Sequence, residues 1–237
     1  MIFNSLPFFI FIGVFLPLYF TLKSKARLLL CLIGSYFFYG WWDYRFLSLV
    51  MFSTLIDYVV GLKLDKEEKG SKRKRLMLIS ILANLGFLGF FKYFNFFIDN
   101  IESAFSLFGS SLMFSRLDWI LPVGISFYTF QTLSYTIDIY RKQLKPTNNW
   151  LAFFSFVAFF PQLVAGPIER ASHLLPQFYK TYKFNYNQVK SGFFLIAFGL
   201  FKKMVIADRA AVLVNQVYNS PADYHGFELV VATFLFA

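Results

Sequence analysis

Residues 153–170 read FFSFVAFFPQLVAGPIER, an apolar run that breaks at proline, glutamine and glycine before it reaches ordinary loop composition. In hydrocarbon every backbone N–H and C=O needs an internal partner, so such a break is tolerated only where protein or a water-filled cavity surrounds it. We therefore predict a re-entrant or broken segment near Pro161 to Arg170. Glu169 and Arg170 are candidates for function, because ionisable groups at membrane depth are costly. The alternative is a plain helix end with capping charges.

The composition indicates an integral membrane protein. Of all residues 57% are hydrophobic, 22% aromatic and only 15% charged, whereas soluble domains carry about 25% charged residues. The net charge of +10 would suggest nucleic acid in a soluble chain. Here the Lys and Arg residues fall in short loops between apolar runs, so we interpret them as topology signals and expect no nucleic-acid partner. Cys31 is the only cysteine, which excludes a disulfide framework and a cysteine zinc site; we expect no metal.

Apolar runs of about 17–25 residues are candidate membrane spans. We predict an all-α, polytopic helical bundle that forms one transmembrane domain over residues 1–237. The expected spans are residues 2–22, 28–44, 46–62, 76–97, 119–140, 150–165 (short or re-entrant), 191–207 and 227–237 (partial). Because the last run is too short to cross and stops mid-pattern, the chain is expected to be the N-terminal part of something longer.

The charges of the loops predict the orientation. Residues 63–75 carry seven Lys or Arg against three acids, whereas residues 98–118 are almost free of Lys and Arg. Basic loops follow the first, third and fifth spans, and positive loops stay in the cytoplasm. We therefore expect a multi-pass protein of the cytoplasmic (inner) membrane, with its N-terminus outside.

A polar stripe runs along the predicted span of residues 121–140. Gly124, Tyr128, Gln131, Tyr135 and Asp138 recur at spacings of four, three, four and three, which places them on one helix face. Two phenols, an amide and a carboxylate inside a membrane span must face protein or water rather than lipid. They line a polar tunnel or form a hydrogen-bonded seam between helices, and the sequence does not choose.

Other polar residues carry weaker signals. Asp57 is expected to be an anchor or a partner for another helix, and Lys202 and Lys203 either snorkel to an interface or face a cavity. His173 and His225 stand in segments of loop composition, where a lone histidine is usually incidental. No Ser-His-Asp order, HExxH or CxxC is present, so spacing alone gives no enzyme class.

Several short motifs resemble the membrane-bound O-acyltransferase superfamily, and within it the bacterial branch that serves alginate O-acetylation. The similarity runs the length of the chain. The most specific motifs are LPVGISFYTFQ at residues 121–131, FPQLVAGPIER at 160–170, and GLFKK at 199–203 with Ala207-Asp208. Weaker ones are Phe3-Asn4-Ser5, Leu16-Pro17, SYFFYGWW at residues 35–42, Asp57-Tyr58 with Gly61, and KYFNFF at 92–97.

The resemblance implies a multi-helix enzyme that passes an acyl (acetyl) group across the membrane for O-acetylation of an extracytoplasmic polysaccharide such as alginate. It implies membrane lipids and an extracytoplasmic glycan acceptor, or a periplasmic or extracellular acetyltransferase, as partners. No bound cofactor is expected; the acyl donor, acetyl-CoA or an acyl carrier, is a substrate.

The family's catalytic histidine belongs to a motif well after the segment that matches residues 199–208, so we expect it beyond Ala237 and expect no catalytic residue in this chain, which alone would be inactive. The tunnel or motif candidates are Tyr128, Gln131, Tyr135, Asp138, Gln162, Gly166, Pro167, Glu169, Arg170, Lys202 and Lys203. Two other classes remain open: a transporter or channel fragment, since broken helices also mark transporter sites, and a non-catalytic membrane scaffold.

Overall fold

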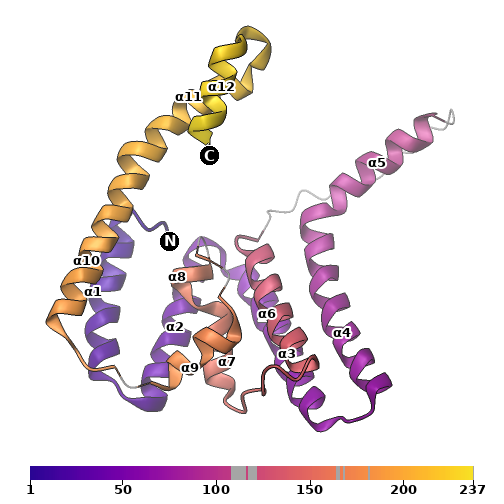
Figure 1. Cartoon of the computed structure of the whole chain (residues 1–237), viewed down its shortest axis with the longest axis vertical. Helices are drawn as coiled ribbons and strands as arrows, with labels where there is room; N and C mark the ends of the chain where they lie inside the picture. The colour runs from indigo at the N-terminus through magenta and orange to yellow at the C-terminus, as the bar shows by residue number, and fades with distance from the viewer. Residues whose placement is uncertain (108–115, 117–121, 164–165, 168, 181, 237) are drawn as a thin grey trace. The chain divides into compact units, whose positions relative to one another are not determined.

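A computed structural model of the chain describes residues 1–107, 116, 122–163, 166–167, 169–180 and 182–236 (Figure 1). These residues form helices joined by turns and loops, and no strand occurs among them, which confirms the predicted all-α class. The chain divides into two compact units, Met1–Tyr182 and Lys183–Ala237, which we describe separately. Its organisation as a single transmembrane domain stays a prediction.

The first unit begins with a series of apolar helices. They are α1 (Leu6–Thr21), α2 (Ser24–Asp43), α3 (Leu47–Lys66), α4 (Gly70–Leu88) and α5 (Phe94–Leu107). Among the residues that the structure describes, two stretches are long and apolar enough to cross a membrane, namely Ser24–Lys66 with 43 residues and Gly70–Leu107 with 38. Shorter apolar helices cover Leu6–Thr21, Trp150–Leu163 and Gly226–Phe236. This content is compatible with a membrane helical bundle.

Two short irregular turns divide the long stretches. A 3-10 turn, Tyr44–Phe46, separates α2 from α3, and the Asp43 carboxylate stabilises it by accepting hydrogen bonds from the backbone and guanidinium of Arg45. A π-helical turn, Gly89–Tyr93, joins α4 to α5. Helix α5 corrects an expectation: the sequence predicts a loop over residues 98–118, whereas residues 98–107 are helical in the structure. Phe97, Ile101 and Phe105 recur every four residues there, which is the pattern of an amphipathic helix. Asp99 and Glu102 make this stretch less apolar, but the helix continues through it.

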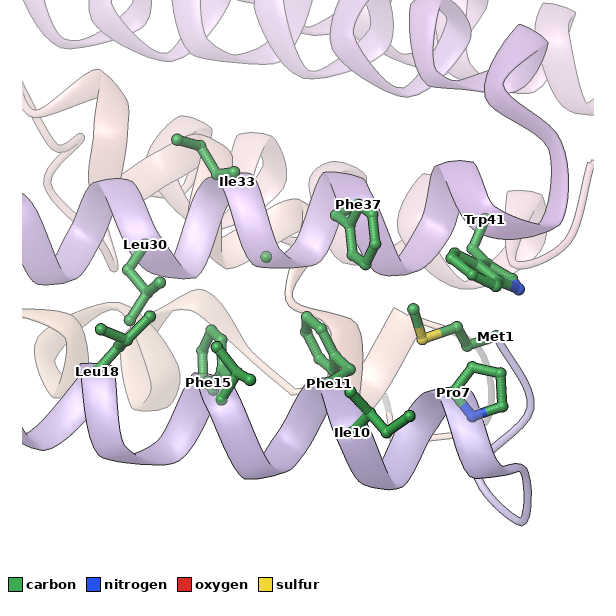
Figure 2. Close-up of a pocket in the computed structure, with 12 residues that line it drawn as sticks. Met1, Pro7, Ile10, Phe11, Phe15, Leu18, Leu30, Ile33, Phe37 and Trp41 are labelled. Atoms are coloured by element: carbon green, nitrogen blue, oxygen red, sulfur yellow. The ribbon is translucent and has the colours of Figure 1, made fainter.

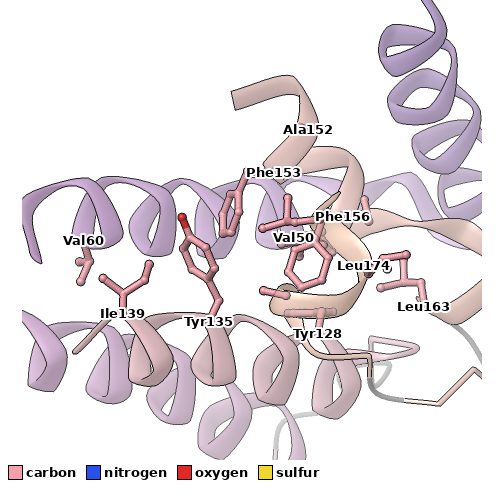
Figure 3. Close-up of a cluster of buried hydrophobic side chains, with 14 of the residues drawn as sticks. Val50, Val60, Tyr128, Tyr135, Ile139, Ala152, Phe153, Phe156, Leu163 and Leu174 are labelled. Carbon is pink, nitrogen blue, oxygen red and sulfur yellow. The ribbon is translucent and has the colours of Figure 1, made fainter. Parts of the chain in front are cut away.

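The remaining helices of the first unit complete its core. They are α6 (Ile125–Tyr140), α7 (Trp150–Ala158), α8 (Phe160–Leu163) and α9 (Ala171–Tyr179). Helix α6 packs against α3 and α4, and α7 packs against α2. Tyr135, Phe153 and Phe156 are fully buried where these layers meet (Figure 3). His173 lies in α9 rather than in a loop. The first residues of the predicted span 119–140 lie outside the described residues.

An apolar groove runs between α1 and α2 (Figure 2). Phe11 of α1 projects toward Phe37 of α2, with 6.1 Å between their ring centroids, and the groove has a volume of about 470 Å³. Gly34 permits the close approach, because a Cβ atom there would lie 2.8 Å from Cε2 of Phe15.

The second unit is a helical hairpin. Helix α10 (Tyr186–Phe201) continues through a π-helical turn (Lys202–Ala207) into α11 (Asp208–Asn219), and a 3-10 turn (Pro221–Asp223) leads to α12 (Gly226–Phe236). Tyr218 of α11 holds α12 through a hydrogen bond between its hydroxyl and Oγ1 of Thr233 at 3.0 Å. Its ring also lies 6.1 Å from that of Phe236.

Candidate functional site

The break between α7 and α8 has a local chemical cause. Pro161 has no N–H to donate to the carbonyl of Val157, and the N–H of Phe160 donates instead to Oγ of Ser35 on α2 at 3.2 Å. The carbonyl of Phe156, left without its usual helical partner, accepts from Nε2 of Gln131 at 2.8 Å and of Gln162 at 2.9 Å. The helix is thus broken at Phe159, next to the predicted segment, and a re-entrant path stays a prediction. Protein side chains from three helices pair its backbone groups, as a break surrounded by apolar residues requires.

Two glycines let the chain fold tightly around this break. Gly124, just before α6, has a φ of +76°, and a Cβ there would lie 2.4 Å from the carbonyl oxygen of Leu163. Gly166 donates its N–H to the carbonyl of Gln162 at 3.0 Å, and a Cβ there would lie 2.3 Å from Cα of Gln162. Only glycine fits either position without moving backbone.

The polar stripe of α6 faces the interior of the first unit. Tyr128, Gln131 and Tyr135 are at most 3% exposed, whereas Asp138 is partly exposed. Gln131 bonds to the break, and Tyr135 packs its ring 4.5 Å from that of Phe153 (Figure 3). The hydroxyl of Tyr135 accepts from the N–H of Thr147 at 3.3 Å. Gln131 therefore bonds to a neighbouring helix, as in a helix seam, and Tyr135 bonds to the connection between α6 and α7.

Three buried hydroxyls differ from this seam because they have no partner within the part of the chain that the structure describes. They belong to Tyr36 on α2 and to Tyr128 and Thr129 on α6. The Tyr128 side chain is only 1% exposed. Nearly every buried polar group in a native protein is paired with protein or ordered water, so each exception needs an explanation. These hydroxyls remain able to bond to a ligand or to water.

A second polar cluster, which we call the Asp57 network, joins α3, α4 and α6. The Asp57 carboxylate accepts from Oγ of Ser80, from Nδ2 of Asn84 at 2.8 Å and from Oγ1 of Thr136 at 3.3 Å. Oδ1 of Asn84 accepts from Oγ of Ser53 at 2.7 Å and from Oγ1 of Thr132 at 3.2 Å. All six side chains are at most 1% exposed.

Sequence reasoning found Asp57 as a partner for other helices but missed the rest of this network. A signal was present, because each helix contributes two polar residues four positions apart within an apolar run: Ser53 and Asp57, Ser80 and Asn84, Thr132 and Thr136. Such a spacing places both side chains on one helix face. A search for paired small polar residues in apolar runs would have found all six.

Arg73 is a further buried residue that sequence reasoning missed. Its guanidinium donates to the carbonyls of Leu64 and Glu67, at the end of α3, and to those of Ile139 and Tyr140, at the end of α6. The last carbonyls of a helix lack internal partners and carry partial negative charge. One cation on α4 therefore satisfies the ends of two neighbouring helices.

The other predicted site residues lie apart from the break. Glu169 pairs with Nδ1 of His173 at 2.9 Å, and Arg170 is the exposed residue that precedes α9; Pro167 is also exposed. Lys202 and Lys203 belong to the second unit, where Lys202 lies 4.5 Å from the ring of Phe198 and Lys203 pairs with Asp208. The structure thus gathers Tyr128, Gln131, Gln162 and Gly166 around the break. The functional roles of all these residues stay predictions.

Comparison with known proteins gives a consistent group of relatives. The chain is 38% identical to the probable alginate O-acetylase AlgI of Pseudomonas putida over 92% of its own length and 45% of that protein. It is 38% identical to the corresponding protein of Pseudomonas aeruginosa, over 92% of the chain and 42% of the relative. The peptidoglycan O-acetyltransferase of Helicobacter pylori is 35% identical over 89% of the chain and 45% of the relative.

The chain therefore spans less than half the length of the relatives that it matches. No protein-family model matches it. No solved structure matches it either.

Proposed function

Because the chain belongs to the membrane-bound O-acyltransferase family, we propose that it is part of an enzyme that transfers acetyl groups to the hydroxyls of an extracytoplasmic polysaccharide. One relative is named for alginate and another for peptidoglycan, and an ester bond from acetyl to a sugar hydroxyl is common to both. This shared chemistry supports glycan O-acetylation more strongly than it supports either acceptor. Within this proposal, alginate is the specific acceptor that we put forward.

The observation that carries the proposal is the helix break with unpaired hydroxyls beside it. Tyr128 is buried among apolar residues, and its hydroxyl bonds to nothing in the described part of the chain. A buried polar group without a partner costs about 1–3 kcal/mol, so a purely structural role would favour phenylalanine there. We propose that the hydroxyl contacts the acyl group or its carrier during transfer.

The location follows from the same chemistry. Activated acyl donors are made in the cytoplasm, and a charged donor such as acetyl-CoA or an acyl carrier does not cross hydrocarbon unaided. We propose a multi-pass enzyme of the cytoplasmic membrane, with its N-terminus outside, that hands the acyl group to a glycan or to a periplasmic or extracellular acetyltransferase. Membrane lipids surround its apolar helices.

The general base is proposed to lie outside residues 1–237. Acylation of a hydroxyl near neutral pH needs such a base, and histidine is its usual source. The His173 side chain is 70% exposed and pairs with Glu169, and both residues follow the break in the sequence. His225 is exposed and lies in a connection of the second unit. Neither has the buried setting that would bring it to an acyl group within the membrane.

The test is genetic and chemical. The gene that encodes the chain is disrupted in its host, the envelope polysaccharides are separated, and acetate released from each by mild base is measured. We expect ester-linked acetate to disappear from one polysaccharide and to return when the complete gene is restored. Unchanged acetate in every fraction would contradict the proposal, and the fraction that loses acetate identifies the acceptor.

A further inference from the structure

A basic pocket lies where α3 ends and α4 begins. It has a volume of about 410 Å³ and is lined by Lys63, Lys66, Glu67, Lys72, Arg75 and Leu76. Four cations thus face one carboxylate. Coulombic attraction favours an anion here, and the position at the end of two apolar helices brings the pocket to the level of lipid headgroups.

The one carboxylate of the pocket leaves most of the positive charge uncompensated. Oε1 of Glu67 already accepts from the N–H of Lys69 at 3.1 Å, and Oε2 lies 3.7 Å from Nζ of Lys72. Within the described ranges the structure shows no ion pair for Lys63, Lys66 or Arg75. Three cations therefore converge without an acidic partner, which leaves room for the charges of a phosphate group.

The base of the pocket is held in place by Arg73, between Lys72 and Arg75 in the sequence. Its side chain points into the protein and binds the carbonyls of Leu64 and Glu67 on one side and those of Ile139 and Tyr140 on the other. The first turns of α4 are thereby fixed against the end of α3. A site whose backbone is fixed before binding loses less conformational freedom when a ligand arrives.

The cations continue into apolar helix faces. On α4, Arg75 is followed at a spacing of four and then three by Ile79 and Leu82, which are 53% and 69% exposed. On α3, Lys63 is preceded at spacings of four by Val59 and Leu55, which are 38% and 48% exposed. Residues three or four apart share a helix face. The surface is therefore charged at one end and apolar along its length, as a phospholipid is.

We propose that this pocket binds the phosphate of an anionic phospholipid of the surrounding membrane, whose acyl chains lie along the exposed apolar residues of α3 and α4. The charge of the pocket selects an anionic headgroup over a zwitterionic one. The adjoining apolar faces select a lipid over a soluble phosphate compound, which would leave them uncovered. The site is separate from the helix break, so it is independent of the proposed acyl transfer.

The test measures binding of phosphatidylglycerol to the purified chain by native mass spectrometry, after reconstitution with phosphatidylcholine. The double substitution Lys63→Gln/Arg75→Gln removes two cations of the pocket. The matched control, Lys69→Gln/Lys74→Gln, removes two exposed cations of the same basic stretch, residues 63–75, that do not line the pocket. Each cation near a lipid headgroup contributes about fivefold in affinity, so we expect about a 25-fold loss in the first variant. The control should change affinity by less than about threefold, because neither side chain lines the pocket and exposed charges are partly screened by salt.

Two outcomes would overturn the proposal. Equal losses in the two variants would mean that the whole loop attracts anionic lipid and that no pocket is formed. Displacement of the lipid by inorganic phosphate at an equal concentration would mean that a soluble phosphate compound is the occupant. All four substituted side chains are exposed, so folding is expected to persist, and an unchanged elution volume checks this.

Discussion

The Asp57 network allows a prediction in which one substitution repairs another. Asn84→Asp replaces the Nδ2 that donates to Asp57 at 2.8 Å by a carboxylate oxygen, so two buried carboxyls face each other. At an effective dielectric constant of 20, two unit charges at that distance repel by about 6 kcal/mol. Holding one carboxyl protonated at pH 7 instead costs about 4 kcal/mol, since an ordinary aspartate has a pKa near 3.9 and each unit corresponds to 1.36 kcal/mol.

Protonation is therefore the less costly response, and it contributes about 4 kcal/mol to the destabilisation of Asn84→Asp at pH 7. The variant's folded state then binds one more proton than its unfolded state, so lower pH favours folding. Between pH 7 and pH 5 this contribution should fall to about 1.5 kcal/mol.

Adding Asp57→Asn should restore most of the stability. The new amide donates to the new carboxylate, while Ser80 and Thr136 still donate to position 57 and Ser53 and Thr132 still donate to position 84. The one hydrogen bond lost is that from Nδ2 of Asn84 to the carbonyl of Ser80 at 3.0 Å, worth about 1 kcal/mol. Asn84→Asp alone loses this bond too, so the double variant should recover the whole cost of protonation, about 4 kcal/mol at pH 7.

The measurement is the free energy of unfolding of the purified chain, obtained from titration of dodecyl maltoside micelles with sodium dodecyl sulfate and followed by circular dichroism. The wild type, both single variants and the double variant form a thermodynamic cycle. If the double variant is no more stable than Asn84→Asp alone, or if the destabilisation is the same at pH 5 and pH 7, the assigned donors and acceptors are wrong.

Three further predictions concern the break and its surroundings. Tyr128→Phe removes a hydroxyl that has no partner in the described residues, so the folded yield should be unchanged or higher, while acetyl transfer by the complete protein should fall at least tenfold. Full transfer would show that Tyr128 does not belong to the site. Tyr135→Phe is the control, because it removes a hydroxyl that is hydrogen-bonded. Gly124→Ala places a Cβ 2.4 Å from a backbone carbonyl at positive φ, and a thermal-stability assay should show a loss of at least about 1–3 kcal/mol; wild-type stability would show that the break can shift. Glu169→Gln removes a half-exposed pair with His173, so the folded yield should change little, by less than about 1 kcal/mol in stability; a large drop in yield would point to a buried partner.

The fold class was predictable because apolar runs and charged borders alternate along the sequence. The break was predictable as well, because Pro161 lacks an N–H and the sequence around it stays apolar. Most of the groups that pair the broken backbone were not, since Ser35 and Gln131 come from helices that are distant in sequence. A pattern along one helix shows which side chains share a face. It does not show which other helix meets that face.

The candidate site shows the same limit at the level of single residues. The stripe on α6 left a tunnel and a seam equally open, and the structure divides it, because Gln131 and Tyr135 are bonded to protein while Tyr128 is not. The sequence marks Glu169 and Arg170 as functional candidates or as capping charges, and in the structure Glu169 pairs with His173 four positions on. That pair depends on where α9 begins, and a loop composition concealed the start of that helix.

The Asp57 network also bears on how the protein is made. Two of the residues that donate hydrogen bonds to the Asp57 carboxylate, Ser80 and Asn84, lie on α4, which follows α3 after only residues 67–69. Thr132 and Thr136 leave the ribosome much later. Helices α3 and α4 can thus enter the bilayer as a hairpin in which Asp57 already has hydrogen-bond donors. The carboxyl group is then not transferred into hydrocarbon without partners, which lowers the free energy of insertion. Helix α6 then completes the set, and the order of synthesis matches the order in which the bonds are needed.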